Sequence, residues 1–298
     1  MVPTWKGRQA PADQVVTPEA LLRWIVCSLY MDEAIPTGVL LQWYYQLVTG
    51  VKLSHGQITA LVESTPGMYL DPPAPKKQLS FRAVLEEPPP SFQGFVQDSM
   101  STEEVVSTAA WAEARDLLSK GGWPLTDDTL YKYITVAAWL QNRSPVLASV
   151  SFGRLLRMVN ICCHQHTILG VCDGLIVPYS QSEEYERLAN AEAGQPTGVK
   201  SNEAYIRNWA ELKDCLMQLI RLSPTEEVEV SQVKLQCRSR LHKELSETVF
   251  GHTTLSKLLD DPNFGPEFKI NCHHSGRQRI ALNIYKDLTS KIEHREQK

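Results

Sequence analysis

The sequence lacks an excess of positive charge, and it lacks long apolar runs. Among its 298 residues, 30 are Lys or Arg and 34 are Asp or Glu, so the formal net charge is −4. Such a chain has no overall positive field for holding nucleic acid, and any such binding must come from a local patch. No apolar run reaches the roughly 20 residues that a membrane-spanning helix needs. We therefore expect no membrane partner.

The sequence also lacks the marks of a secreted protein. Residues 1–8 do not contain the apolar core of a secretory signal. The seven cysteines are odd in number, scattered, and mostly placed in apolar helical patterns, which favours reduced thiols. These features predict an intracellular protein and leave an organelle open.

Motifs for catalysis and for cofactor or metal binding are missing as well. The chain has no phosphate-binding loop, no dinucleotide-binding glycine pattern, no nucleophile elbow and no zinc-protease motif. Cys162, Cys163, His164 and His166 crowd one helical stretch, whereas zinc sites usually use spaced pairs of ligands. We therefore predict no catalytic residue, no cofactor and no metal, which favours a binding protein over an enzyme.

The patterns that are present predict a mainly α fold with small β-hairpins, in the α+β class. A helix start is marked by the capping hydroxyl of Thr17 and by Pro18 in the first turn. Two short apolar runs flank Asp173 and Gly174, which is a strong hairpin signal. From such signals we predict a winged-helix-like unit at 15–72, a Pro-rich linker at 73–100, a helical region at 101–190 with a hairpin near 168–177, a second linker at 191–204, a winged-helix domain at 205–288 and a flexible tail at 289–298.

The most informative stretch is residues 245–260, which joins a helix end, a Phe250–Gly251 hinge and a short apolar helix. Two candidate strands follow it, and this order outlines a winged-helix module. With 228–233, 255–259 and 268–270, the stretch resembles the OST-HTH family, also called LOTUS domains, in forms like those of alveolate protists. In the protist proteins a further region precedes the OST-HTH domain, and residues 151–198 are similar to that region. Residues 17–72 resemble the OST-HTH domain itself, through residues 34–40 and 58–63.

The resemblance implies RNA-associated work, in the cytoplasm or a ribonucleoprotein granule. Some members of the family bind RNA, including structured G-rich RNA, and others dock DEAD-box helicases. The family offers no catalytic residue to carry over.

A cluster of basic residues is the candidate RNA site, because arginine and lysine suit phosphate oxygens. The alternative is a solvated helix face, the usual meaning of a charge run. Asp260 and Asp261 follow the helix that would enter a DNA groove, so we expect no sequence-specific DNA binding. The predicted RNA-binding residues are Lys234, Arg238, Arg240, Lys243, Lys257, Arg277 and Arg279.

The first unit favours a protein partner instead. Residues 17–72 hold two cations against five acids, together with surplus aromatic residues. Trp24, Tyr44 and Tyr45 are the predicted protein contacts, and the alternative is that these aromatics fill a small core.

Two functions follow from these observations. The first is a non-enzymatic adaptor that binds RNA, recruits a partner such as a DEAD-box helicase, or does both. The second is an architectural subunit of a large complex, organellar or ribonucleoprotein, in which the same modules contact only protein.

Overall fold

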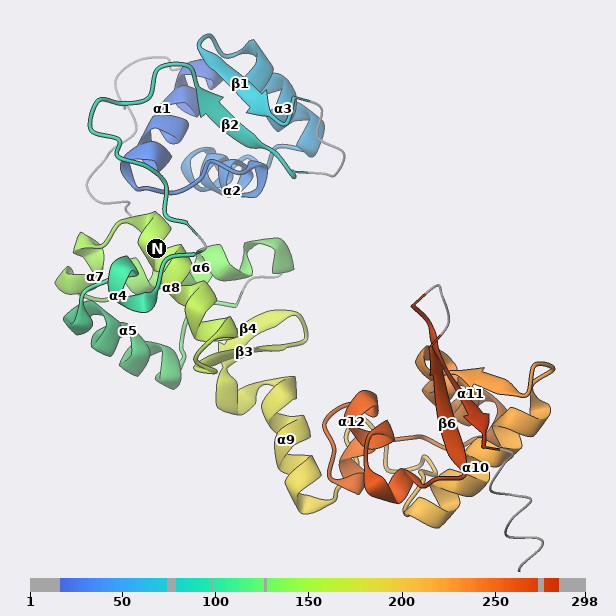
Figure 1. The fold of residues 1–298 in the computed structure, drawn as a ribbon. Helices are drawn as coiled ribbons and strands as arrows, with labels where there is room; N and C mark the ends of the chain where they lie inside the picture. The colour runs from blue at the N-terminus through green and yellow to red at the C-terminus, as the bar shows by residue number, and fades with distance from the viewer. Residues whose placement is uncertain (1–16, 74–78, 98, 126–127, 273–275, 284–298) are drawn as a thin grey trace, which may run out of the picture. The chain divides into compact units, whose positions relative to one another are not determined.

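The structure of the protein is a computed structural model that describes residues 17–73, 79–97, 99–125, 128–272 and 276–283. The chain divides into two compact units, residues 1–183 and residues 184–298, and each has its own hydrophobic core. Helices dominate, and the sheets are antiparallel with two or three strands, which confirms the mixed α+β class (Figure 1). The predicted tail at 289–298, and the predicted domain ends at 15–16 and 284–288, lie outside the described residues.

Unit 1 begins with three helices and a hairpin. The caps come from the sequence: the Thr17 hydroxyl accepts from the backbone of Ala20, Thr37 does the same for the second helix, and Ser54 forms a capping box with Gln57. Each such cap contributes about 1 kcal/mol. These elements are α1 (Pro18–Met31), α2 (Gly38–Thr49), α3 (His55–Ser64), β1 (Met68–Asp71) and β2 (Arg82–Leu85).

Strand β2 lies where an extended linker was expected at 73–100. It pairs with β1 along its whole length, and Thr37 forms an isolated bridge to Arg82. Phe81 and Leu85 are buried in the unit 1 core, and the backbone N–H of Gly38 donates to the Phe81 carbonyl at 3.0 Å. The alternating apolar residues of 79–85 are too short a run to stand out between two Pro-rich stretches, so the sequence pattern hid this strand.

The rest of unit 1 shares the same core. Asp173 and Gly174 form the turn of a hairpin, and both have positive φ (50° and 77°), the conformation that such a two-residue turn requires. The buried residues of α1–α3 and of α5–α8 belong to one cluster, so the first helices and the central helices of unit 1 form one body. The elements are α4 (Thr102–Val105), α5 (Thr108–Lys120), α6 (Lys132–Gln141), α7 (Pro145–Ser149), α8 (Phe152–His164), β3 (Leu169–Cys172) and β4 (Leu175–Pro178).

Unit 2 packs two longer helices and a short one against a three-stranded sheet. Its first strand, β5, joins the hairpin β6–β7 by pairing with β7, so the order in the sheet is β5-β7-β6. Gly251, at φ 79°, ends the 3-10 turn of Glu247–Phe250. The elements are α9 (Glu183–Ala193), which starts at the last residue of unit 1, α10 (Trp209–Leu222), β5 (Glu227–Glu229), α11 (Val233–Leu241), α12 (Leu255–Leu259), β6 (Phe268–Cys272) and β7 (Gln278–Leu282).

The chain at 191–204, where a second linker was expected, is bound to the rest of unit 2. The backbone N–H of Thr197 donates to Ser246 Oγ at 2.8 Å and to Thr248 Oγ1 at 3.0 Å. The Thr248 hydroxyl in turn donates to the Gln195 carbonyl at 2.6 Å. Because Ser246 and Thr248 are buried, these bonds fix the segment in place.

Candidate nucleic-acid interface

The predicted RNA-binding cations of α11 are held by carboxylates. Lys234 Nζ lies 2.6 Å from Glu247 Oε2. Arg238 donates from Nε and Nη2 to the two oxygens of Glu244, the second bond at 2.8 Å. Both glutamates are buried, so each positive charge is fixed over a negative charge of the same unit.

Lys243, just after α11, is paired in the same way. Its Nζ lies 2.5 Å from Oε1 of Glu211, in the first turn of α10. The Lys243 hydrogen bond holds the pKa of the Glu211 carboxyl below its ordinary value. The Arg238 hydrogen bond does the same for the pKa of Glu244. Both carboxyls are therefore ionised at neutral pH, and both offset a predicted RNA contact.

The hairpin cations face acids across the sheet. Arg277 Nη1 lies 3.7 Å from Glu229 Oε2, and Arg279 Nη1 lies 3.5 Å from Glu227 Oε2. Strand β5 carries both glutamates and pairs with β7, so the register of the sheet sets these contacts. Asn271 also donates to Glu227, at 2.8 Å.

Two of the seven predicted residues have no acid within ion-pair distance among the described residues. Arg240 is exposed and donates to the Leu222 carbonyl at 3.4 Å. Lys257 is exposed on α12, before Asp260 at the helix end. The structure therefore does not gather the seven cations into one unopposed patch. Residues 184–298 hold 17 cationic and 17 acidic residues, so this part of the chain has no net positive field.

The predicted protein contacts of unit 1 lie mostly inside it. Tyr44 and Tyr45 are buried (5% and 8% exposed), and Trp24 is partly buried against the same core. The Tyr44 ring packs edge-on against Phe152 of α8, with centroids 6.0 Å apart. Tyr44 thus packs α2 against α8, and Tyr45 is buried in the same core, as in the alternative that the sequence left open.

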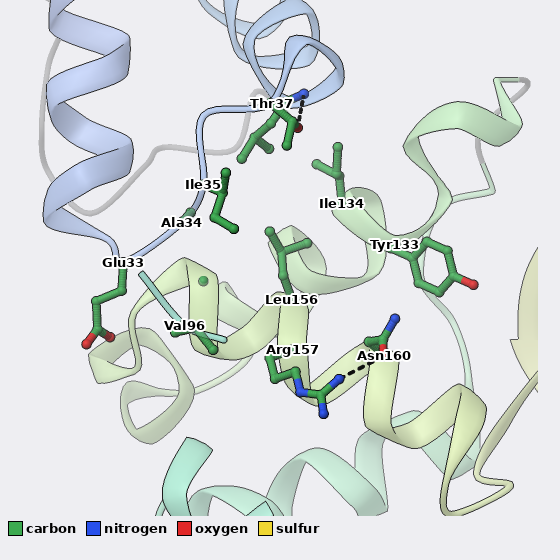
Figure 2. A pocket seen from close by; sticks show the side chains of 12 residues that line it. Glu33, Ala34, Ile35, Thr37, Val96, Tyr133, Ile134, Leu156, Arg157 and Asn160 are labelled. Atoms are coloured by element: carbon green, nitrogen blue, oxygen red, sulfur yellow. Dashed lines mark hydrogen bonds between the residues drawn. The ribbon is translucent and has the colours of Figure 1, made fainter. Parts of the chain in front are cut away.

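A hollow of about 270 Å³ opens in unit 1 between the α1–α2 connection and helices α6 and α8 (Figure 2). Ile35, Ile134 and Leu156 line it with apolar surface, and Ile35 is 38% exposed. Arg157 and Asn160 lie along one side, joined by a hydrogen bond of 3.1 Å. Its size and lining suit one apolar side chain of a partner rather than a cofactor.

In the cysteine–histidine stretch, Cys162 and Cys163 belong to the core of unit 1, whereas His164 and His166 are exposed. Cys162 is buried, and burial raises the pKa of the Cys162 and Cys163 thiols to about 12. Neither is a thiolate at neutral pH, the form that binds metal. Within the described ranges, no three His, Cys, Asp or Glu side chains converge as metal ligands.

The sequence reasoning missed the acids that pair with the cations. Residues 234–243 contain four cations and no acid, but Glu244 follows directly and Glu247 lies three residues further on. Glu211 is distant in sequence and is brought to Lys243 only by the packing of α10. A wider window would have shown the first two, and no local signal shows the third.

No family model, curated protein or solved structure matches this chain. In the part of the chain that the structure describes, no helix combines the length and apolar character needed to cross a membrane.

Proposed function

We propose that this chain is a non-enzymatic adaptor whose unit 2 docks a protein partner. One observation carries the proposal: five of the seven cations expected to bind RNA are in ion pairs with acids of unit 2. A surface of fixed, alternating charges suits a partner with complementary charges and fixes its orientation. It suits an extended polyanion such as RNA less well, because tight binding needs many unneutralised cations and five of the seven are already neutralised by an acid of the same unit.

We infer that unit 2 is a winged-helix module. The order of helix, strand, two helices and hairpin supports this, as does the pairing of β5 with the last strand β7. Residues 18–85 of unit 1 repeat this order of elements, with α1, α2, α3 and then the hairpin β1–β2. Thr37, between α1 and α2, takes the place of the first strand, because it forms a β-bridge to Arg82 of β2. Two such modules on one chain fit an adaptor, since modules of this kind bind more often than they catalyse.

The resemblance to OST-HTH domains makes a DEAD-box helicase one partner class to test. In this proposal the partner is recruited through unit 2. The apolar hollow of unit 1 offers a second, smaller contact. Two modest sites on one chain raise the effective concentration of a partner without new chemistry. The same arrangement would serve an architectural subunit of a large complex.

RNA remains the second candidate because the paired arginines stay accessible. The side chains of Arg238 and Arg277 are 66% and 65% exposed although each contacts a glutamate. An arginine has five N–H donors, so it can hold a carboxylate and still offer donors to a phosphate. Arg240 and Lys257 would add two further contacts.

Titration of the full chain with oligouridine and with a structured G-rich RNA, at 50 to 200 mM salt, tests the choice. If unit 2 docks protein, RNA binding should be weak. The slope of the logarithm of the binding constant against the logarithm of the salt concentration should stay below about 2 in magnitude, as expected for few phosphate contacts. A protein-docking unit also predicts that Arg238→Glu with Arg240→Glu changes affinity no more than Arg115→Glu with Lys120→Glu on α5 of unit 1. A slope of about 5 or more in magnitude would show an RNA-binding unit instead, provided that Arg238→Glu with Arg240→Glu reduces the slope and the α5 control does not.

A further inference from the structure

A polar pocket of about 430 Å³ lies within unit 2. Its lining comes from α9 (Arg187), from the chain just after α9 (Thr197–Val199), from α11 (Lys234 and Arg238), and from the chain around the 3-10 turn and the start of α12. Side chains from four places in the sequence therefore converge on one space. Lys234 and Arg238 are among the cations predicted to bind RNA, and the other lining residues belong to neither predicted site.

Two of its cations are held in place by buried acids. Arg238 uses Nε and Nη2 for Glu244, and Nη1 has no acceptor among the described residues. Lys234 Nζ carries three N–H donors and contacts Glu247 at 2.6 Å. Because the glutamates fix the side chains, the remaining donors are held ready for a ligand, which lowers the entropy lost on binding.

Further donors at the pocket lack acceptors. The exposed guanidinium of Arg187 has no acid within ion-pair distance, and the Thr253 hydroxyl has no hydrogen-bond partner, both judged over the described residues. Over the same residues, the backbone N–H groups of Gly198 and Val199 have no acceptor either. The buried hydroxyls of Ser246 and Thr248 bind Thr197, so the segment that carries these two N–H groups is rigid.

We propose that this pocket binds the phosphate of a phosphoserine or phosphothreonine on the protein partner, an inference that rests on the proposed docking function. The cations exceed the acids in the lining by three to two. The unused donors are N–H and O–H groups, which a phosphate dianion accepts through three terminal oxygens.

The phosphodiester of RNA fits this space less well. It carries a single negative charge and two terminal oxygens, and both of its ester arms must leave the pocket. A phosphomonoester presents more charge and one arm, which suits donors that converge from several segments on one space. We therefore assign the pocket to a phosphorylated side chain rather than to an RNA backbone.

Amide NMR of the full chain tests the assignment, because the amides of Gly198, Val199 and Thr253 report on the pocket directly. The probes are N-acetyl-phosphoserine amide, the same compound without phosphate, inorganic phosphate and oligouridine. The expected result is that the phosphoserine probe shifts these amides and the unphosphorylated probe does not. Arg187→Gln is expected to lower the affinity for the phosphoserine probe about tenfold, since a charge-assisted contact is lost.

Arg221→Gln is the control and should leave the affinity unchanged, because Arg221 is an exposed arginine of α10 outside the pocket lining. Arg187 has no structural partner among the described residues, so its variant should fold even where a change at Arg238 does not. The proposal is overturned if the phosphoserine probe shifts none of these amides, or if Arg187→Gln and Arg221→Gln bind it equally well. It is also overturned if inorganic phosphate binds as tightly as the phosphoserine probe, or if oligouridine binds more tightly. Capture of a protein partner that survives phosphatase treatment would leave the docking function standing and reject the phosphate site alone.

Discussion

At the scale of single residues, the main feature of unit 2 is the pairing of exposed cations with buried carboxylates. Glu244 and Glu247 are each about one tenth exposed, while the side chains of Arg238 and Lys234 are half or more exposed. A buried carboxylate without its cation is costly, so the pair holds the acid in the fold as much as it holds the cation. The cations are thus structural first, and any ligand can use only their spare donors.

Lowering the pH is expected to weaken unit 2. The Arg238 hydrogen bond holds the pKa of Glu244 below its ordinary 4.5, so the unfolded chain binds this proton more tightly than the folded one. The stability that this pair contributes is therefore present above pH 4.5 and is lost as the pH falls through the folded pKa. Fluorotryptophan NMR can follow this, because Trp209 is the one tryptophan of residues 184–298. The native signal of Trp209 should disappear at a lower urea concentration at pH 4 than at pH 7.

Glu244→Gln separates this pair from general acid effects. The variant should unfold at lower urea than the wild type at pH 7, because Arg238 loses its carboxylate, and should show a smaller drop between pH 7 and pH 4. Glu226→Gln is a matched control, since this exposed glutamate makes no side-chain hydrogen bond or ion pair among the described residues. Equal pH dependence in Glu244→Gln and the wild type would mean that the pair does not stabilise unit 2.

At the scale of elements, helix α8 is fixed against the α1–α2 connection at a close backbone approach. The Gly153 N–H donates to the Asp32 carbonyl at 2.9 Å, and a Cβ at Gly153 would lie 2.3 Å from the Glu33 carbonyl oxygen. Arg154 adds bonds to the Glu33 carboxylate and to the carbonyls of Glu104 and Val105. One turn of α8 thus ties three segments of unit 1 together.

Gly153→Ala is expected to destabilise unit 1 by about 1–3 kcal/mol, because backbone atoms must shift to admit the methyl group. Gly56→Ala on α3 is the control: its Cβ would meet nothing within 4 Å, so the change should be neutral or stabilise by up to about 1 kcal/mol. Urea unfolding followed at the fluorotryptophan signals of unit 1 gives both values. A neutral Gly153→Ala would show that this approach is not tight in solution.

Much of the local structure could be predicted from the sequence, and the tertiary contacts could not. The caps of α1, α2 and α3 need only a hydroxyl at the right position, and the turn at Asp173–Gly174 needs only residues that tolerate positive φ. Strand β2 was missed because its pairing with β1 spans a Pro-rich loop. Three ion pairs of the candidate RNA site could not be predicted, because Glu211, Glu227 and Glu229 reach the cations only through the packing of α10 and the register of β5.

At the scale of the whole molecule, the chain has two separate cores. A cavity in one core is expected to weaken that unit first, since the buried contacts it removes belong to that unit. Leu219→Ala in unit 2 and Leu155→Ala in unit 1, both fully buried, should each cost about 2–5 kcal/mol. Peptide-level hydrogen exchange should show lost protection mainly in the mutated unit. Equal loss in both units for either variant would mean that the chain unfolds as one cooperative body.

The proposal that unit 2 docks protein is tested most directly by capturing the tagged full chain from its own cells, with and without nuclease, and measuring partner stoichiometry. We predict one protein partner at a fixed ratio that survives nuclease and that crosslinks to residues of unit 2. Loss of the partners on nuclease treatment, together with RNA crosslinks at Arg238, Arg240 or Arg277, would contradict it.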